Sequence, residues 1–246
     1  MKIKADLHIH SCLSPCGSLE MSPRSIAGRA KELGLDLICL TDHNSALNSP
    51  AMAKACAAAG IHCLFGLEAT TREEVHTLCY FATVPEALKL SELIDVKLPD
   101  LKNDPEIFGD QAIVDENDNV LGQYEKILGN AADIGLEELR DLVLELGGLF
   151  VPAHINRARN SLISQLGFVL PGERYSAVEV HKSIYLRGAE QPDTLDYPVI
   201  SNSDAHYLTD IGLVYNEIDL KDFSLDALRE ALEQKAVTVR TAAKLP

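Results

Sequence analysis

The stretch Leu35–Asn44 has the sequence LDLICLTDHN, an apolar run followed at once by polar residues. Apart from Asp36, Leu35–Thr41 is a continuous apolar run, which is typical of a strand buried on both faces, as in parallel sheets. Polar side chains directly after such a strand lie at the edge where α/β folds place their ligand sites. This stretch therefore predicts an α/β fold with a site at its strand ends.

Strands and helices are predicted to alternate on both sides of this stretch. Before it, Lys2–His8 is expected to form a strand, and a helix begins at Ser22-Pro23, with Ser22 as N-cap, and ends at Gly34. The other predicted strands are Ile61–Glu68, Val75–Ala82, Leu149–Ala153, Ala177–Val180, Val199–Asn202, Tyr215–Leu220 and Val237–Arg240, and the other helices are Pro50–Ala59, Leu136–Leu146 and Ser224–Gln234. Repeated β–α units predict a parallel sheet that closes into a barrel.

Residues 98–129 interrupt this alternation. The segment is rich in Asp, Asn and Glu, and Asp115–Asn119 (DENDN) has the composition of a turn. We interpret residues 98–129 as an insertion or lid within a single domain that spans residues 1–246.

Composition restricts the classes of partner and compartment. The 246 residues carry a formal charge of −15, from 37 acidic and 22 basic residues, which opposes binding of long nucleic acid but permits a short oligonucleotide. Six cysteines are too few for a disulfide scaffold. Because there is neither an apolar run of about 18 residues nor a signal peptide, we expect a soluble cytoplasmic protein without a membrane partner.

Most of the histidines follow predicted strands. A single histidine in such a place is more often structural than functional. Six imidazoles gathered together would repel one another when charged and be costly to desolvate, so a structural role for all of them is untenable. The clustered residues are His8 and His10 in DLHIH, His43 in TDHN, Glu68 in GLEAT, His76 in EVHTL, His154 in VPAHI, and Asp204 and His206 in SNSDAH.

The spacing and type of these residues indicate metal binding. In an extended segment, residues i and i+2 face the same side, so the imidazoles of His8 and His10 can reach one metal ion. Imidazoles favour Zn, Mn or Fe over Ca or Mg, and bridging carboxylates hold neighbouring ions about 3.5–4 Å apart. Such a cluster lowers the pKa of a bridging water, which becomes hydroxide near neutral pH. It also holds the attacking and leaving oxygens of an in-line displacement, and both effects suit phosphate-ester hydrolysis.

The ordered motifs H-x-H, T-D-H, G-x-E, E-x-H-x-L, A-H and S-D-A-H resemble the PHP (polymerase and histidinol phosphatase) family over residues 6 to 206. The resemblance implies a distorted (β/α)7 barrel with two or three divalent metal ions and phosphoesterase or phosphatase activity. It implies that His8, His10, Glu68, Asp204 and His206 are catalytic, with Glu68 as the bridging carboxylate. The implied metal ligands are His8, His10, His43, Glu68, His76, His154, Asp204 and His206.

The loop after H-x-H departs from the family pattern, which usually has a further Asp or His about five or six residues on. Here Pro15 and Cys16 occupy that place. A Cys16 thiolate would favour Zn or Fe over Mn and complete a trinuclear metal centre. The alternative is that Cys16 only packs in the loop, or pairs with Cys12, and that the third ion is weakly bound or absent.

Candidate substrate-binding residues follow two of the strands. Arg157, three residues after His154, suits bidentate phosphate recognition, with a solvated loop charge as the alternative; His181 and Lys182 follow another strand and are expected to face the same mouth. Asp6 and Asp42 adjoin ligand histidines, so either is a candidate to fix an imidazole tautomer, and Asp42 could equally hold its loop. Arg159 and Arg187 are weaker candidates, and His62 is assigned a structural role.

These observations favour a metal-dependent phosphoesterase that hydrolyses a small phosphomonoester, a nucleotide or a short oligonucleotide. Two alternatives remain. A metal-dependent amidohydrolase would usually bridge its ions with a carbamylated lysine or a carboxylate, and no lysine here follows a strand in that position, whereas Glu68 does. A non-catalytic metal-binding regulatory module has no physical need for so complete a set of ligands.

Overall fold

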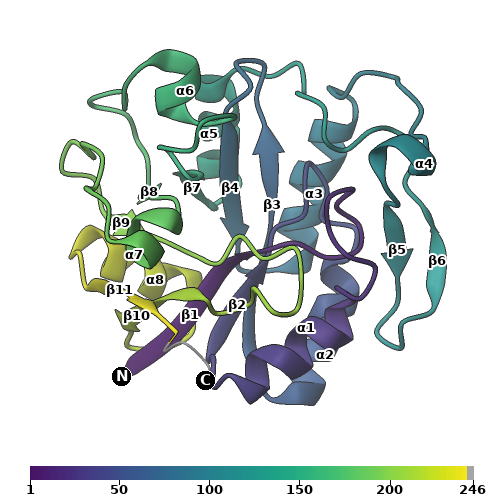
Figure 1. Ribbon diagram of the computed structural model, residues 1–246, viewed down its shortest axis with the longest axis horizontal. Coiled ribbons are helices and arrows are strands. Elements are labelled where there is room, and N and C mark those ends of the chain that lie inside the picture. The colour runs from purple at the N-terminus through teal and green to yellow at the C-terminus, as the bar shows by residue number, and fades with distance from the viewer. Residues whose placement is uncertain (243–246) are drawn as a thin grey trace.

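A curled mixed sheet forms the centre of the molecule (Figure 1). The computed structural model describes residues 1–242, and its main sheet has seven strands in the order β11-β10-β1-β2-β3-β4-β7. The strands are β1 (Lys2–Ile9), β2 (Leu37–Leu40), β3 (His62–Thr70), β4 (His76–Phe81), β7 (Leu149–Pro152), β10 (Val214–Asp219) and β11 (Val237–Thr241).

A second, parallel pair of strands, β8 (Val178–Glu179) and β9 (Val199–Ile200), lies between β7 and β1. Ser176 N donates to Phe150 O over 2.9 Å on the β7 side. On the other side, a bridge joins Ile9 to Ala205, the segment that follows β9. The curled sheet and this pair together form a distorted barrel, which confirms the expected fold class.

The expectation of a parallel sheet is wrong for part of this barrel. Strands β1, β2 and β3 run parallel, but β4 is antiparallel to both β3 and β7. The reason is the connection of residues 71–75 between β3 and β4, which is far too short for a parallel crossover. The first residue of β4 consequently lies at the edge where β1, β2 and β3 end.

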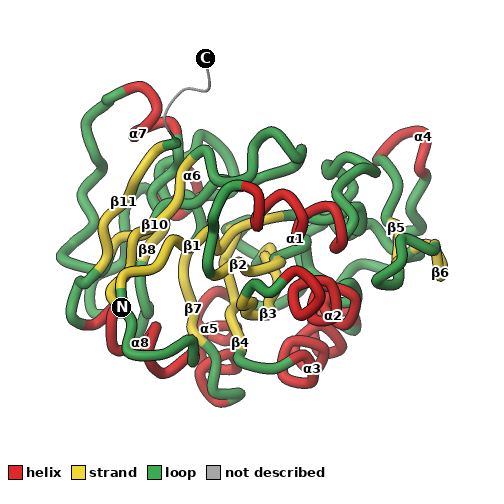
Figure 2. The backbone as a smooth tube through the Cα atoms, turned by 90° about the horizontal axis from the view of Figure 1, so that it is seen from below, coloured by secondary structure: helices red, strands yellow, loops and turns green. Residues whose placement is uncertain are grey.

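Helices cover the outside of the sheet, and α2 packs against both α1 and α3 (Figure 2). As predicted, Ser22 caps the first helix by accepting from Ser25 N, and Ser224 caps the last by accepting from Ala227 N. The helices are α1 (Pro23–Glu32), α2 (Ser49–Ala59), α3 (Val84–Asp95), α5 (Leu136–Glu145), α6 (Leu162–Leu166), α7 (Ser183–Arg187) and α8 (Leu225–Glu233). None of the helices within residues 1–242 is long and apolar enough to cross a bilayer.

The segment 98–129 forms a small unit of its own at one side of the molecule (Figure 1). It contains α4 (Pro105–Phe108) and a hairpin of β5 (Ala112–Val114) and β6 (Val120–Gln123). The predicted turn is present, because Asp115 Oδ1 accepts from Asn117 N over 2.8 Å and from Asn119 N over 2.9 Å.

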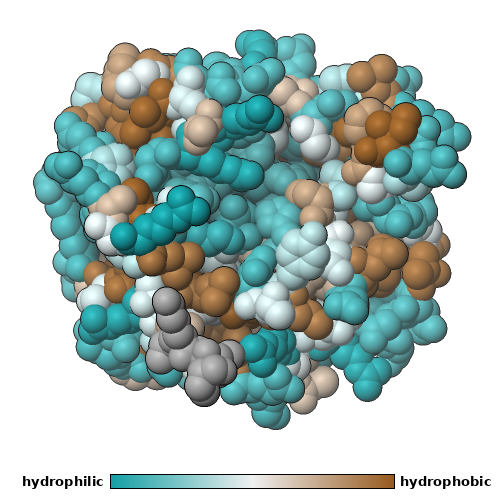
Figure 3. Space-filling model, viewed as in Figure 1, coloured by the Kyte–Doolittle hydropathy of each residue, from teal (hydrophilic) through white to brown (hydrophobic). Residues whose placement is uncertain are grey.

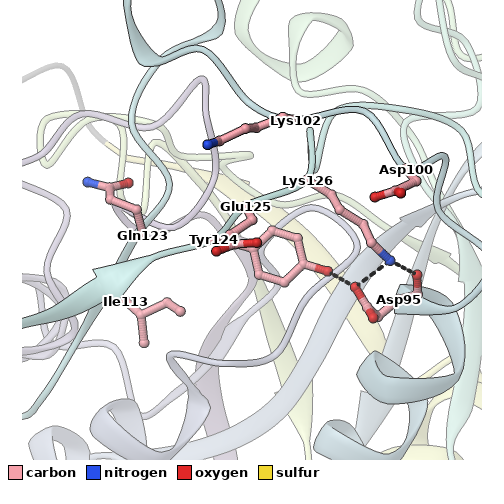
Figure 4. A pocket seen from close by; sticks show the side chains of 8 residues that line it. All are labelled: Asp95, Asp100, Lys102, Ile113, Gln123, Tyr124, Glu125 and Lys126. Carbon is pink, nitrogen blue, oxygen red and sulfur yellow. Dashed lines mark hydrogen bonds and ion pairs between the residues drawn. The ribbon is translucent and has the colours of Figure 1, made fainter.

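Two sets of contacts attach this unit to the barrel. At its base, Tyr124 donates to Asp95 at the end of α3, and Lys126 Nζ lies 3.1 Å from Asp95 Oδ1 (Figure 4). At its inner side, Asn48 donates to Ala112 O over 3.1 Å and accepts from Val114 N over 3.0 Å. The unit is therefore packed against the loops that follow β1 and β2. Its role as a lid stays a prediction.

Candidate metal centre

All eight donors that the resemblance implies lie together at one edge of the barrel. His8 is on β1 and His10 directly after it, and Glu68 is on β3. His76 begins β4, which shares this edge because β4 is antiparallel. The others follow the ends of β2, β7 and β9, and they are His43, His154, Asp204 and His206.

Glu68 is the centre of the cluster. It is buried, and its Oε1 lies 2.9 Å from both His76 Nδ1 and His154 Nε2. Its Oε2 lies 3.1 Å from His43 Nδ1 and 3.3 Å from His10 Nε2. One carboxylate thus faces imidazoles on both of its oxygens, which is the position of a bridging ligand.

The tautomers of His8 and His10 follow from the groups behind their rings. His8 Nδ1 lies 3.1 Å from the Glu179 carboxylate, which accepts only, so Nδ1 carries the proton. His10 Nδ1 lies 3.0 Å from Ser14 Oγ, whose own proton is donated to Asp42 Oδ1 over 2.7 Å. Ser14 therefore accepts from His10, and both rings turn an Nε2 lone pair into the cluster.

Four electron-pair donors consequently face one another without a hydrogen atom of their own. His8 Nε2 and His10 Nε2 are 3.1 Å apart, and Asp204 Oδ1 lies 3.5 Å and 3.4 Å from them. The fourth donor is Glu68 Oε2, 3.5 Å from His8 Nε2. Such an arrangement requires a cation between the donors, either a proton or a metal ion.

The wider cluster offers more than one such place. Three groups of side chains have ligand atoms within 4.8 Å of one another, namely His8-His10-Asp204, His10-His43-His206 and His43-Glu68-His76. In addition, the buried His154 Nδ1 has no hydrogen-bond partner among the described residues, and His43 Nδ1 makes no hydrogen bond although it lies 3.1 Å from Glu68 Oε2. The residues present therefore fit divalent metal ions.

Electrostatics act differently on the donors. Burial alone would lower the pKa values of His8 and His10, but the carboxylates around them outweigh it and raise both, so a metal ion competes with a proton there. Burial lowers the pKa of His43 well below its usual value and also lowers that of His76, so both are neutral near pH 7. Burial alone would raise the pKa of Glu68, but the imidazoles of His76 and His8 outweigh it and hold this pKa well below its ordinary value. Ionised carboxylates and neutral imidazoles are the forms that bind metal.

Two donors have strained backbones. His154 has a φ of +29° and Asp204 a φ of +45°, in the left-handed region that residues other than glycine rarely adopt. Lys182, a predicted substrate-binding residue, donates from Nζ to Ser203 O and to Asp204 O (3.3 Å for the second), so it helps to hold this strand end. Backbone strain of this kind is concentrated at functional sites.

Several residues behind the donors were not anticipated from the sequence. Glu179 orients His8 and Ser14 orients His10, but neither belongs to a recognisable motif. For Glu179, the sequence offered one indication, a single acidic residue within the apolar run Ala177–Val180. Asp42 holds the loop after β1 through Ser11 and Ser14 and reaches His10 only indirectly. Asp6 contacts no donor imidazole and instead accepts from Ser203 N and Gly212 N.

Cys16 lies near the cluster but in none of its three groups. The residue is exposed, yet partial burial of its thiol and the charges of Glu68 and Asp204 raise its pKa to about 12. The thiol is thus protonated unless a metal ion displaces its proton. Cys16 as a ligand stays a prediction.

The candidate substrate-binding residues Arg157 and His181 follow β7 and β8, at the edge of the barrel where the donors cluster; we call this edge the mouth. The Arg157 side chain is 44% exposed, and its Nη1 lies 3.7 Å from Asp204 Oδ2. His181 is half-buried, its Nδ1 is 2.8 Å from Ser183 Oγ, and its pKa is lowered by burial and by nearby His154. His62 lies at the opposite end of β3 from Glu68, stacked on Phe223 with ring centroids 3.6 Å apart, and its structural role stays a prediction.

Comparison with known sequences gives one long family match. Residues 6–155 match the model of the PHP domain, and residues 189–237 match that of the PHP-associated region. The uncharacterized protein YqxK of Bacillus subtilis (strain 168) is 36% identical over an alignment of 110 residues, and the match covers 40% of this chain and 28% of YqxK.

Solved structures share the fold at low sequence identity. The lesion-specific endonuclease PfuEndoQ of Pyrococcus furiosus has a TM-score of 0.69 at 22% identity, over 97% of this chain and 58% of that one. An endonuclease Q complex with a 27-mer duplex substrate, with an abasic lesion at the active site, gives 0.68 at 22% identity over 95% of this chain and 57% of that one. A two-domain protein of Bacteroides vulgatus ATCC 8482, containing a predicted PHP-like metal-dependent phosphoesterase, gives 0.54 at 17% identity over 98% of this chain and 65% of that one.

The chain spans less than two thirds of each of these relatives, 28% of YqxK and 58% of PfuEndoQ. The PHP-domain match is independent of them, covers more than half of the chain, and contains every clustered donor except Asp204 and His206. The chain therefore belongs to the PHP domain family, whose members are metal-dependent hydrolases that act on phosphoric ester bonds.

Proposed function

We propose that this protein hydrolyses a small phosphomonoester, a nucleotide or a short oligonucleotide with the help of two or three divalent metal ions. The observation that carries the proposal is the set of four facing electron-pair donors on His8, His10, Glu68 and Asp204. A purely structural cluster would have paired these atoms with hydrogen-bond donors, because unsatisfied buried polar atoms are costly.

The chain's own residues would hold the ions from both sides of Glu68. His76 and His154 approach Oε1 of this carboxylate, whereas His43, His10 and His8 approach Oε2, and Asp204 lies beside His8 and His10. Zn, Mn or Fe suits this set of imidazole and carboxylate donors. When bound, such ions acidify water and neutralise the charge on phosphoryl oxygens.

Substrate phosphate would be recognised at the mouth. The Arg157 guanidinium lies beside Asp204 on a partly exposed side chain, so it can donate two parallel hydrogen bonds to phosphate oxygens. His181, with its lowered pKa, is neutral near pH 7 and can exchange a hydrogen bond with the leaving group. Lys182 is engaged with backbone carbonyls, so its part is to hold Asp204 and to add positive charge near the mouth.

A lesion-specific cut in DNA is a second candidate, favoured by the likeness to endonuclease Q over nearly the whole chain. The charge of −15 opposes tight binding of a long duplex by this chain alone. Parallel assays with p-nitrophenyl phosphate, mononucleotides, short oligonucleotides and a duplex with an abasic site would separate the candidates. Turnover of the abasic-site duplex without turnover of any smaller substrate would contradict the small-substrate proposal and favour a DNA endonuclease.

The first test is elemental analysis of protein purified without chelator or nickel, followed by the substrate panel. We expect two or three equivalents of Zn, Mn or Fe, and competitive inhibition by inorganic phosphate, which an amidohydrolase would not show. His10→Ala and Asp204→Ala should abolish turnover while circular dichroism stays unchanged. His62→Ala removes a histidine outside the cluster and should keep full metal content and turnover.

Near-normal turnover by Asp204→Ala with a metal-replete site would refute the ligand assignment. A fully metal-loaded wild type that hydrolyses none of the phosphoesters would instead favour the regulatory module.

A further inference from the structure

Glu179 is a buried acid that belongs to no motif of the sequence and is not itself one of the clustered donors. It lies on the short strand β8 and is 2% exposed. Its two oxygens accept from the His8 ring (3.1 Å), from His154 N (2.9 Å) and from Asn202 Nδ2 (2.8 Å). These three donors come from three other chain segments, so one carboxylate joins four segments at the edge of the barrel.

The contact with His8 fixes more than the position of the ring. An ionised carboxylate offers no proton, so His8 must donate from Nδ1 and present Nε2 to the cluster. The equivalent contact of His10 is to a neutral hydroxyl, that of Ser14. Of the two histidines in H-x-H, only His8 is thus backed by a full negative charge, which makes an imidazole a stronger ligand.

The contact with His154 acts on the backbone. His154 has a φ of +29°, and its N–H is held by Glu179 Oε2. This left-handed conformation turns the chain so that His154 Nε2 reaches Glu68 Oε1 at 2.9 Å. Glu179 therefore stabilises a strained conformation on which a second donor depends.

We propose that Glu179 is a positioning residue of the metal centre, which acts through the ring of His8 and the backbone of His154 without touching metal or substrate. The inference rests on the proposed function only in that the clustered donors bind metal ions. It goes beyond that function because it assigns metal affinity to a residue outside the ligand set.

The test compares Glu179→Gln and Glu179→Asp with a control in the same polar network. Gln removes the charge and leaves one of the three donors facing an amide NH2, whereas Asp keeps the charge but is one methylene shorter. Asn216→Ala is the control, because Asn216 donates to Asn202 Oδ1 over 2.8 Å and accepts from Ser201 N, and its amide contacts neither His8 nor His154. Thermal unfolding of the metal-free proteins would measure the purely structural damage of each change.

Zinc affinity, measured by competition with a chelator, is the main readout. We expect Glu179→Gln to lose about 10- to 100-fold in affinity, Glu179→Asp to lose less, and Asn216→Ala to stay near the wild type even if its melting temperature falls as far. In the zinc-loaded protein, ring-nitrogen NMR should find a strongly hydrogen-bonded Nδ1–H of His8 in the wild type and in Asn216→Ala, but not in Glu179→Gln.

Equal affinity losses in Glu179→Gln and Asn216→Ala, or an unchanged Nδ1–H signal, would overturn the proposal. If Glu179→Gln does not fold, the affinity of Glu179→Asp relative to Asn216→Ala decides in the same way. Turnover of the wild type is recorded separately. A wild type that binds zinc tightly but hydrolyses no phosphoester would contradict the proposed function and still leave the role of Glu179 to be decided by affinity.

Discussion

Arg157 and Arg159 are two exposed arginines in one loop, and they differ in whether a carboxylate lies beside the guanidinium. Arg157 lies 3.7 Å from Asp204, whereas no ion pair is found for Arg159 among the described residues. Hydrogen bonds to charged groups are worth about 1.5–3 kcal/mol. We therefore expect Arg157→Ala to lower kcat/KM for a phosphoester by roughly 10- to 100-fold, with metal content unchanged.

Arg159→Ala is the matched control for this prediction, since it removes the same charge from the same loop. Steady-state kinetics at fixed ionic strength would measure both variants. Equal losses in the two would indicate a general effect of loop charge and contradict a specific phosphate contact.

At the residue scale, the sequence was sufficient for the donors but not for the residues behind them. Each donor lies near one end of a strand, within it or just after it, in a recognisable motif, so the edge of the barrel brings them together. Glu179 and Ser14 form their contacts across segments distant in the chain. From the sequence, a single acid in an apolar strand does not indicate which imidazole it will contact, because that contact depends on how the barrel closes.

The attachment of the segment 98–129 can be tested at the scale of elements. Asn48, buried at the start of α2, pairs with Ala112 O and Val114 N of this segment. Asn48→Ala would leave both main-chain groups without a partner, at a cost of roughly 2–3 kcal/mol. We expect a lower melting temperature and faster proteolysis within residues 98–129.

Asn117→Ala is the control for this change, because Asn117 is an exposed residue of the same segment's turn. Its effect should stay within about 0.5 kcal/mol. Unchanged proteolysis in Asn48→Ala would argue that the segment already opens freely, as a mobile lid would.

The types and most boundaries of the predicted elements follow from apolar runs and helix caps, but helices α3, α6 and α7 were not predicted, and strand direction could not be predicted throughout. The run Val75–Ala82 has the same apolar character in either direction. Its direction is decided by the short connection before it, which forms a hairpin with β3. The hairpin pairs Thr70 with His76 and so keeps His76 beside Glu68.

Metal removal should lower the stability of the whole molecule. Without a metal ion, ionised Glu68 and Asp204 share a buried site with His8 and His10 and, despite burial, help to raise the pKa of both imidazoles, so that only protons separate these donors. An ion that binds the folded state alone, at 100 times its dissociation constant, adds about 2.7 kcal/mol of stability. We expect a chelator to lower the melting temperature and Zn or Mn to restore it.

Asp204→Ala provides the comparison, since it removes one donor and should respond less to added metal. A melting temperature that is the same with chelator and with excess metal would contradict metal binding by the folded protein.

The closure of the barrel affects the order in which parts of the protein unfold. The seam between β1 and the segment after β9 is crossed by the main-chain bonds His10 N to Ala205 O (2.9 Å) and Ala205 N to His8 O (3.3 Å). A metal ion held by His10 and Asp204 would span the same seam, between residues roughly 190 positions apart. It would act there as a reversible cross-link that closes a very long loop, as a disulfide does in other proteins. Amide exchange at His10 and Ala205 should therefore quicken first when the ion is withdrawn, before the helices on the outside lose protection.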